Sequence, residues 1–166
     1  MAGWAIKAVV GAAVFFAVIQ AIRPARTNPA IDPSQEITAK LSVDPAVQQI
    51  FSRSCEDCHS YRTVWPWYSN VAPVSWLVVR DVDDGRRHMN LSNFSTTPPQ
   101  RVGRILQNMC REVKSGGMPM KIYVPMHPMS KLSTDDVETI CKWTDATLAT
   151  LPPDARAPER GRGRPR

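Results

Sequence analysis

The chain has 166 residues, of which 43% are hydrophobic and 22% charged, a composition ordinary for one globular domain with a small core. Its 15 prolines are about twice the usual share of roughly 5%, which argues against a continuous sheet and favours short helices joined by irregular loops. The formal net charge is +6, but half of it comes from residues 152–166, so the charge does not indicate that the folded part binds nucleic acid.

An apolar stretch occupies residues 4–22 and is interrupted near its start by Lys7. It is typical either of a cleaved signal peptide or of an uncleaved signal anchor, which needs about 17 to 25 apolar residues to span a bilayer. No clear A-x-A-type cleavage site follows it, so we favour a transmembrane anchor over residues 1–23, followed by a linker over 24–43. Both interpretations send the rest of the chain to the periplasmic side of a bacterial inner membrane.

The segment from Cys55 to His59 has the sequence Cys-Glu-Asp-Cys-His. A C-x-x-C-H motif is typical of c-type haem attachment, in which two thiols form thioethers with the haem vinyl groups and the histidine binds the iron. The sequence therefore predicts one covalent haem c held by Cys55, Cys58 and His59. We further expect a backbone carbonyl, from Pro66 or Pro73, to accept a hydrogen bond from His59 Nδ1 and orient the ring.

The rest of the chain predicts an all-α domain over residues 44–151. Helix starts are indicated by prolines and capping residues, and helix faces by apolar residues at i, i+3, i+4 spacing. The expected helices span about 44–55, 73–87, 97–115 and 133–150. The last begins with a capping box, Ser133 to Asp136, and the third ends at Gly116. Residues 152–166, rich in Arg, Pro and Gly, predict a disordered basic tail.

Aromatic residues follow the haem motif closely. Trp65, Trp67 and Tyr68 carry N–H and O–H groups that can donate to haem propionates while their rings pack on the macrocycle. We therefore predict that they contribute to cofactor binding, with plain core packing as the alternative.

A second iron ligand is expected downstream of the third helix. Gly117-Met118-Pro119 resembles the loop that offers a methionine sulfur to the distal face in class I cytochromes c. Met118 is the predicted ligand, and His127 and Met126 are the alternatives. A thioether ligand would raise the reduction potential relative to a second histidine.

Two further cysteines, Cys110 and Cys141, lie outside the motif. In an oxidising compartment they predict a disulfide that closes a loop of about 30 residues, worth on the order of 3 kcal/mol. Two buried free thiols are the alternative. A four-thiolate zinc site would have to combine them with Cys55 and Cys58, and the adjacent His59 and the export signal argue against it.

Short segments on both sides of the motif share the pattern of a known family. They are Cys58-His59-Ser60 through Thr63, Trp65 to Tyr68, Ala72 to Trp76, Gly85 to Asn90, Gly117 to Pro119, Tyr123, His127-Pro128, Leu132-Ser133 and Trp143. Together they resemble the bacterial haem-binding-domain family of small c-type cytochromes over roughly residues 20–150. The resemblance implies haem binding and a membrane-tethered construction.

These features predict a membrane-anchored monohaem c-type cytochrome that carries single electrons on the periplasmic side. It is expected to be an electron-transfer protein rather than an enzyme, with membrane-bound respiratory proteins as redox partners and no nucleic-acid partner. The alternative is a haem enzyme or ligand sensor with an open distal site, such as a peroxidase-like centre. A thiol oxidoreductase using Cys55 and Cys58 is a third hypothesis, but the sequence lacks the βαβ setting expected for it.

Overall fold

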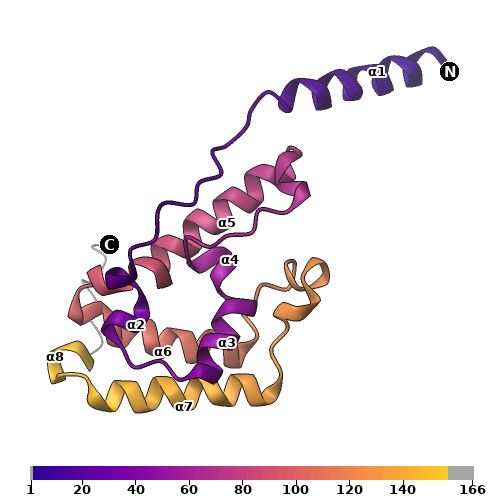
Figure 1. Ribbon diagram of the computed structural model, residues 1–166. Coiled ribbons are helices and arrows are strands. Elements are labelled where there is room, and N and C mark those ends of the chain that lie inside the picture. Colours follow the sequence, from indigo (N-terminus) through magenta and orange to yellow (C-terminus); the bar gives the residue numbers. More distant parts are fainter. Residues whose placement is uncertain (1, 157–166) are drawn as a thin grey trace, which may run out of the picture.

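The computed structural model describes residues 2–156, and these residues form helices joined by loops, which confirms the all-α prediction. Figure 1 shows a helical body from which the first helix, α1 (Ala2–Ile19), projects. The longer helices of the body are α3 (Pro45–Ser54), α5 (Val74–His88), α6 (Pro99–Ser115) and α7 (Thr134–Thr150). The short ones are η1 (Pro33–Gln35), α2 (Ile37–Lys40), α4 (Glu56–His59), η2 (Trp67–Asn70), η3 (Leu91–Thr96), η4 (Val124–Met126), η5 (Pro128–Ser130) and α8 (Pro153–Arg156).

Most residues predicted to begin or end the long helices do so, whereas α6 begins at Pro99, two residues after the predicted start at Thr97. Pro45 occupies the first turn of α3, directly after Asp44. Ser133 caps α7 in a complete capping box, since its hydroxyl accepts from the Asp136 N–H while the Asp136 carboxylate accepts from the Ser133 N–H. Gly116 ends α6 with φ of 69°, a left-handed conformation that glycine adopts without strain.

The hydrophobic core lies between α3, α6 and α7. Phe51 of α3 meets Trp143 of α7 edge to face, with ring centroids 5.6 Å apart. The indole Nε1 of Trp143 donates to the Ser42 carbonyl at 2.9 Å, so the one polar atom of this buried ring is satisfied. Leu106 of α6 and Ile140 of α7 are fully buried between these helices.

A disulfide joins α6 to α7. Cys110 and Cys141 lie with Sγ atoms 2.05 Å and Cα atoms 4.8 Å apart, as the sequence predicted. The pair consumes two of the four cysteines, so a zinc site built from four thiolates is not available to this fold.

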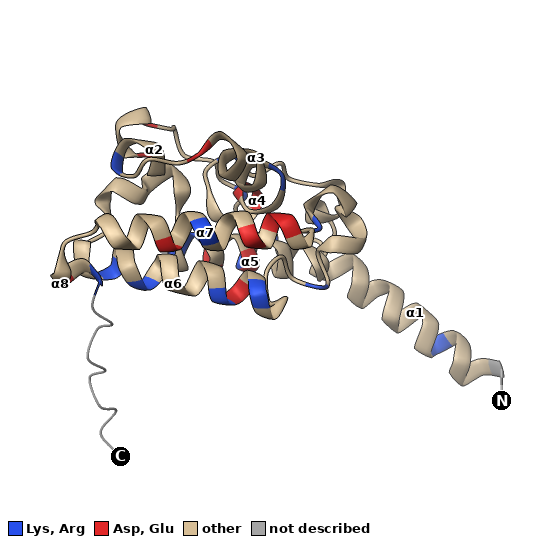
Figure 2. Cartoon of the chain, turned by 90° about the horizontal axis from the view of Figure 1, so that it is seen from below, with Lys and Arg blue, Asp and Glu red and all other residues tan. Residues whose placement is uncertain are grey.

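Helix α1 makes little contact with the body. Every side chain from residue 3 to residue 18 is exposed, and Lys7 is the one charged residue of the helix (Figure 2). Across the part of the chain that the structure covers, no helix combines the length and the apolar character that crossing a membrane requires, so the predicted transmembrane anchor is unsupported.

The predicted linker, residues 24–43, runs along the body instead of standing apart from it. Ile37, Leu41 and Val43 are buried in the main core, and α2 packs against η3. Upstream of them the chain is extended and held by hydrogen bonds, including one from the Asn28 amide to the Thr63 carbonyl at 2.8 Å. The folded domain therefore begins well before residue 44.

The first residues of the predicted tail are helical. Pro153–Arg156 form α8, which packs against α6. Gly103 permits this contact, because a Cβ atom there would come within 2.1 Å of the Ala155 carbonyl oxygen. The rest of the predicted tail, residues 157–166, lies outside the described residues.

Candidate functional site

Cys55, Cys58 and His59 lie on one tight turn between α3 and the end of α4. The N–H groups of Cys58 and His59 both donate to the Cys55 carbonyl, at 3.2 and 2.9 Å. Both cysteines are free thiols and partly buried. Cys55 packs against the hydrophobic core, whereas Cys58 lines a cavity on the other side of the turn.

Helix α5 packs directly on this turn and fixes the histidine. A Cβ atom at Gly85 would come within 2.5 Å of the Cys58 carbonyl oxygen, so this crossing requires glycine. His59 Nδ1 donates to the Gly85 carbonyl at 2.9 Å and lies 3.1 Å from that of Met89. Because Nδ1 is the protonated nitrogen in this arrangement, Nε2 is left with the lone pair that binds a metal.

The acceptors for His59 differ from those predicted. The Pro66 carbonyl accepts from the Ser69 N–H at 3.0 Å, and the Pro73 carbonyl accepts from the Trp76 N–H at 3.1 Å. Both prolines thus serve the first turn of a helix, η2 and α5, and the prediction that either orients His59 was wrong. The C-terminal end of α5 provides the acceptors instead: the Gly85 carbonyl, which also accepts the Met89 N–H, and the Met89 carbonyl directly after the helix.

Burial controls the protonation of the motif. Desolvation raises the pKa of Cys55 to about 12 and that of Cys58 to about 11, with smaller contributions from neighbouring carboxylates. Burial also lowers the pKa of His59, against the effect of the two carbonyls, so that its ring is neutral. Thiols with raised pKa values stay protonated and are poor nucleophiles for disulfide exchange, which argues against the thiol oxidoreductase hypothesis.

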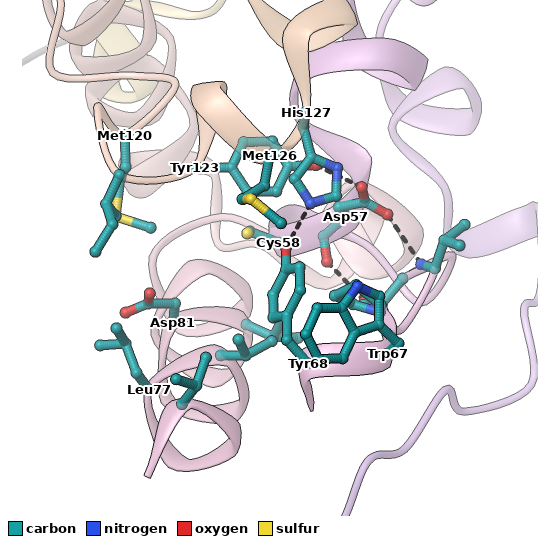
Figure 3. Close-up of a pocket in the computed structure, with 17 residues that line it drawn as sticks. Asp57, Cys58, Trp67, Tyr68, Leu77, Asp81, Met120, Tyr123, Met126 and His127 are labelled. Atoms are coloured by element: carbon teal, nitrogen blue, oxygen red, sulfur yellow. Dashed lines mark hydrogen bonds between the residues drawn. The ribbon is translucent and has the colours of Figure 1, made fainter. Parts of the chain in front are cut away.

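A largely apolar cavity of about 310 Å³ opens beside Cys58 (Figure 3). This volume lies at the lower end of the range of about 300 to 1,000 Å³ typical of small-molecule sites. Leu77 and Asp81 of α5 line one side, and Tyr123 and His127 line the other. The predicted site residues that line it are Cys58, Trp67, Tyr68, Met126 and His127.

A chain of polar contacts crosses the far wall of this cavity. The Tyr68 hydroxyl is hydrogen-bonded to His127 Nε2 at 2.6 Å, and the His127 ring stacks on Tyr123 with centroids 4.0 Å apart. The Tyr123 hydroxyl donates to Asp57 Oδ2 at 2.5 Å. Burial, together with Asp57, raises the pKa of Tyr123, so this hydroxyl keeps its proton.

Asp57 and Tyr123 are the residues that the sequence did not single out. Asp57 occupies a variable position of the C-x-x-C motif, where no pattern assigns a role to a carboxylate. Tyr123 entered only as one residue of the family resemblance. Their pairing joins positions 66 residues apart, and no local signal reports such a contact.

Four predicted site residues lie outside the cavity lining, namely Cys55, His59, Trp65 and Met118. Met118 is 38% exposed just beyond the end of α6, where its N–H donates to the Glu112 carbonyl. Trp65 is partly buried, and its indole Nε1 has no hydrogen-bond partner among the described residues. An unpaired buried donor is a group that a haem propionate could satisfy, so the Trp65 indole N–H fits a haem-binding site.

Comparison with known proteins gives one match. The model of a haem-binding domain matches residues 14–146, which is most of the chain. The chain belongs to this haem-binding-domain family. No curated protein and no solved structure matches it. The match covers the turn from Cys55 to His59, here called the attachment turn, as well as the cavity and the residues between Met118 and His127. It begins before the segment that was predicted as a linker.

Proposed function

We propose that this haem-binding domain is a monohaem c-type cytochrome, in which Cys55 and Cys58 form thioethers with the haem and His59 Nε2 binds the iron. One observation carries the proposal: two free thiols and an imidazole with its Nδ1 already bonded to carbonyls share a single turn beside an apolar cavity. A structural thiol pair would not need a histidine oriented in this way.

The physiological role that we propose is transfer of single electrons. Haem, when bound, supplies the one-electron chemistry, and the protein supplies position and surroundings. The apolar lining of the cavity excludes water, and α5 holds the His59 ring in one orientation. Val64 and Trp67 expose 74% and 72% of their surface at the cavity rim, which offers a partner protein an apolar approach to the site. We propose respiratory proteins of the membrane as those partners.

The second iron ligand is proposed to be a methionine from the segment 117–131. His127 is disfavoured because its Nε2 is already hydrogen-bonded to Tyr68 and its ring is stacked on Tyr123. Met126 lines the cavity, and Met118 lies two residues before Met120, which lines it too. We retain Met118 as the proposed ligand on the class I pattern of its sequence, with Met126 as the alternative.

We propose that the domain works on the periplasmic side of the inner membrane. The Cys110–Cys141 disulfide supports an oxidising compartment, where c-type attachment in bacteria also takes place. The exposed apolar side chains of α1 support attachment of the chain to a membrane. Fractionation of cells that produce the full chain tests this, and recovery of the haem protein in the cytoplasm would contradict it.

Intact-mass analysis and absorption spectra of the full chain, exported in a host with the c-type maturation machinery, test the central proposal. We expect the mass of one covalently added haem and a low-spin spectrum. Cys58→Ala should leave at most one thioether, and His59→Ala should abolish a low-spin spectrum. His88→Ala is the matched control, because this exposed histidine lies outside the attachment turn. A wild-type chain without added haem refutes the proposal.

The hydrogen-bonded pair of Tyr68 and His127 favours one alternative, a haem enzyme or ligand sensor. Both residues line the cavity, where they could bond to an external ligand or move a proton. This alternative predicts a high-spin iron and rapid binding of carbon monoxide, whereas the electron-transfer proposal predicts a low-spin iron that binds carbon monoxide slowly. The same spectra therefore separate the two functions.

A further inference from the structure

The segment 117–131, here called the ligand loop, gains little from apolar packing. Ser130 is the one buried residue of this wholly described segment. Ile122, Met126 and Met129 expose 67%, 57% and 77% of their surface. The loop must therefore be held in place chiefly by polar contacts.

Besides the local bond from the Gly117 N–H to the Ser115 hydroxyl, three groups of side-chain hydrogen bonds among the described residues connect the ligand loop to more distant parts of the domain. They are Tyr123 to Asp57, Tyr68 to His127, and Arg53 to the carbonyls of Met129 and Lys131. The Arg53 bonds act at the end of the loop, next to α7. The other two act across the cavity, and only the bond from Tyr123 reaches the attachment turn itself.

Asp57 is well placed to receive this bond because it is itself fixed. Its Oδ1 accepts from the Val64 N–H at 2.9 Å, and its backbone carbonyl accepts from the Thr63 hydroxyl at 2.7 Å. Its Oδ2 is thereby directed to Tyr123, which donates at 2.5 Å. A hydrogen bond to a carboxylate is stronger than one between neutral groups.

We propose that Asp57 and Tyr123 form a positioning pair, which holds the ligand loop against the attachment turn and thereby keeps the second coordination position of the iron closed to external ligands. The presence of the iron rests on the proposed function, whereas the contact between Asp57 and Tyr123 rests on the geometry of the structure. Asp57, a variable residue of the C-x-x-C motif, would thus hold the ligand loop through Tyr123, which is 66 residues away in the sequence.

Tyr123→Phe in the full, exported chain tests the pair, since it removes one hydroxyl and keeps the ring that stacks on His127. We expect carbon monoxide to bind the reduced protein roughly tenfold to a hundredfold faster, the factor that corresponds to loss of one hydrogen bond to a charged group. Hydrogen exchange of the ligand-loop amides should rise in the same protein. Tyr61→Phe is the matched control, because the Tyr61 hydroxyl makes no hydrogen bond to the described residues.

A double-mutant cycle with Asp57→Ala identifies the contact itself. The two changes together should accelerate carbon monoxide binding by much less than the product of their separate effects. Unchanged carbon monoxide binding and hydrogen exchange in Tyr123→Phe would overturn the proposed pair, and so would equal changes in Tyr61→Phe. If haem is attached in these proteins, the proposed function would stand in either case. A wild type without haem would instead refute the proposed function, while the exchange measurement would still decide whether the pair holds the loop.

Discussion

His59 has little freedom to rotate, because α5 presents two backbone carbonyls to its Nδ1. The same helix approaches the attachment turn so closely that only a residue without a side chain fits at Gly85. The orientation of the candidate iron ligand thus depends on a glycine 26 positions away.

Gly85→Ala tests this dependence. The added methyl group would overlap the Cys58 carbonyl and push α5 away from the turn, with an expected loss of about 1–3 kcal/mol in the free energy of unfolding. His59 would lose its Nδ1 acceptors, and the low-spin spectrum should weaken. Denaturation and spectra measure both effects. Gly11→Ala is the control, since nothing lies within 4 Å of a Cβ atom there; equal stability of the two variants would contradict the close packing.

Met118→Ala is predicted to convert the iron to high spin or to replace its second ligand, as read from the absorption and near-infrared spectra. The variant loses the thioether sulfur of Met118, and an alanine side chain has no atom that can bind iron. Met129→Ala is the control, because Met129 is 77% exposed and outside the cavity lining. An unchanged spectrum for Met118→Ala, together with a change for Met126→Ala, would assign the ligand to Met126.

The start of α7 is joined to α3 through a single carboxylate. Asp136 completes the capping box with Ser133 and forms an ion pair with Arg53 at 2.5 Å. Arg53 also donates to the Met129 carbonyl, so α3, the ligand loop and α7 meet at this point. Burial would raise the pKa of Asp136, but the hydrogen bonds from Arg53 and Ser133 outweigh it and lower the pKa.

Asp136→Asn should cost about 1 kcal/mol of stability at neutral pH through the weakened cap and ion pair. Since the folded-state pKa of Asp136 is lowered, its contribution is present above the unfolded value of about 3.9 and is lost as pH falls through the folded value. Wild type and variant should therefore converge in stability below about pH 4. Urea denaturation across pH measures this. Asp135→Asn, at an exposed neighbour, is the control, and parallel pH curves for wild type and Asp136→Asn would contradict the assignment.

The disulfide connects the two longest helices of the body and flanks the ligand loop on both sides. Replacing Cys110 and Cys141 together by serine should lower the free energy of unfolding by about 3 kcal/mol, through the greater freedom of the unfolded chain. Haem should stay attached, because the thiols proposed to hold it are Cys55 and Cys58. Denaturation and intact mass provide the two measurements. Loss of haem from this variant would mean that the role of the pair is not purely structural.

Arg86 connects the N-terminal part of the chain to the rest of the domain. Its guanidinium donates to the carbonyls of Ser60 and Thr27, both at 2.8 Å, and to Asn28 Oδ1 at 2.9 Å. Farther upstream, the Trp76 indole donates to the Ile22 carbonyl at 2.8 Å. These contacts hold the extended segment against α5, whereas α1 projects from the body (Figure 1).

Arg86→Gln should release this segment, because a glutamine cannot reach all of these acceptors. Trypsin should then cleave after Arg26 several times faster than in the wild type, which limited proteolysis with mass analysis can follow. Arg87→Gln is the control, since this neighbouring arginine forms only an exposed ion pair with Asp84. Equal cleavage rates in both variants would show that the segment is held by other contacts.

Local patterns determined much of this protein in advance. The spacing of Cys55, Cys58 and His59 is the basis for predicting haem attachment. Pro45, Gly116 and the Ser133 capping box set helix ends through contacts within a few residues. The pairing of Cys110 with Cys141 followed because only these two cysteines remained. Each of these inferences needs no knowledge of what lies across the fold.

Tertiary structure alone decided the surroundings of the motif. Three contacts illustrate this: His59 with the Gly85 carbonyl, Gly85 with the Cys58 backbone, and Tyr123 with Asp57. Each contact joins residues at least 26 positions apart, so its distance is set by how the chain packs. Residues 24–43 are a further example. The sequence predicts a linker there, but the segment packs on the body because apolar side chains of α2 are buried in the core. Local sequence specifies which groups are present; only packing specifies which of them meet.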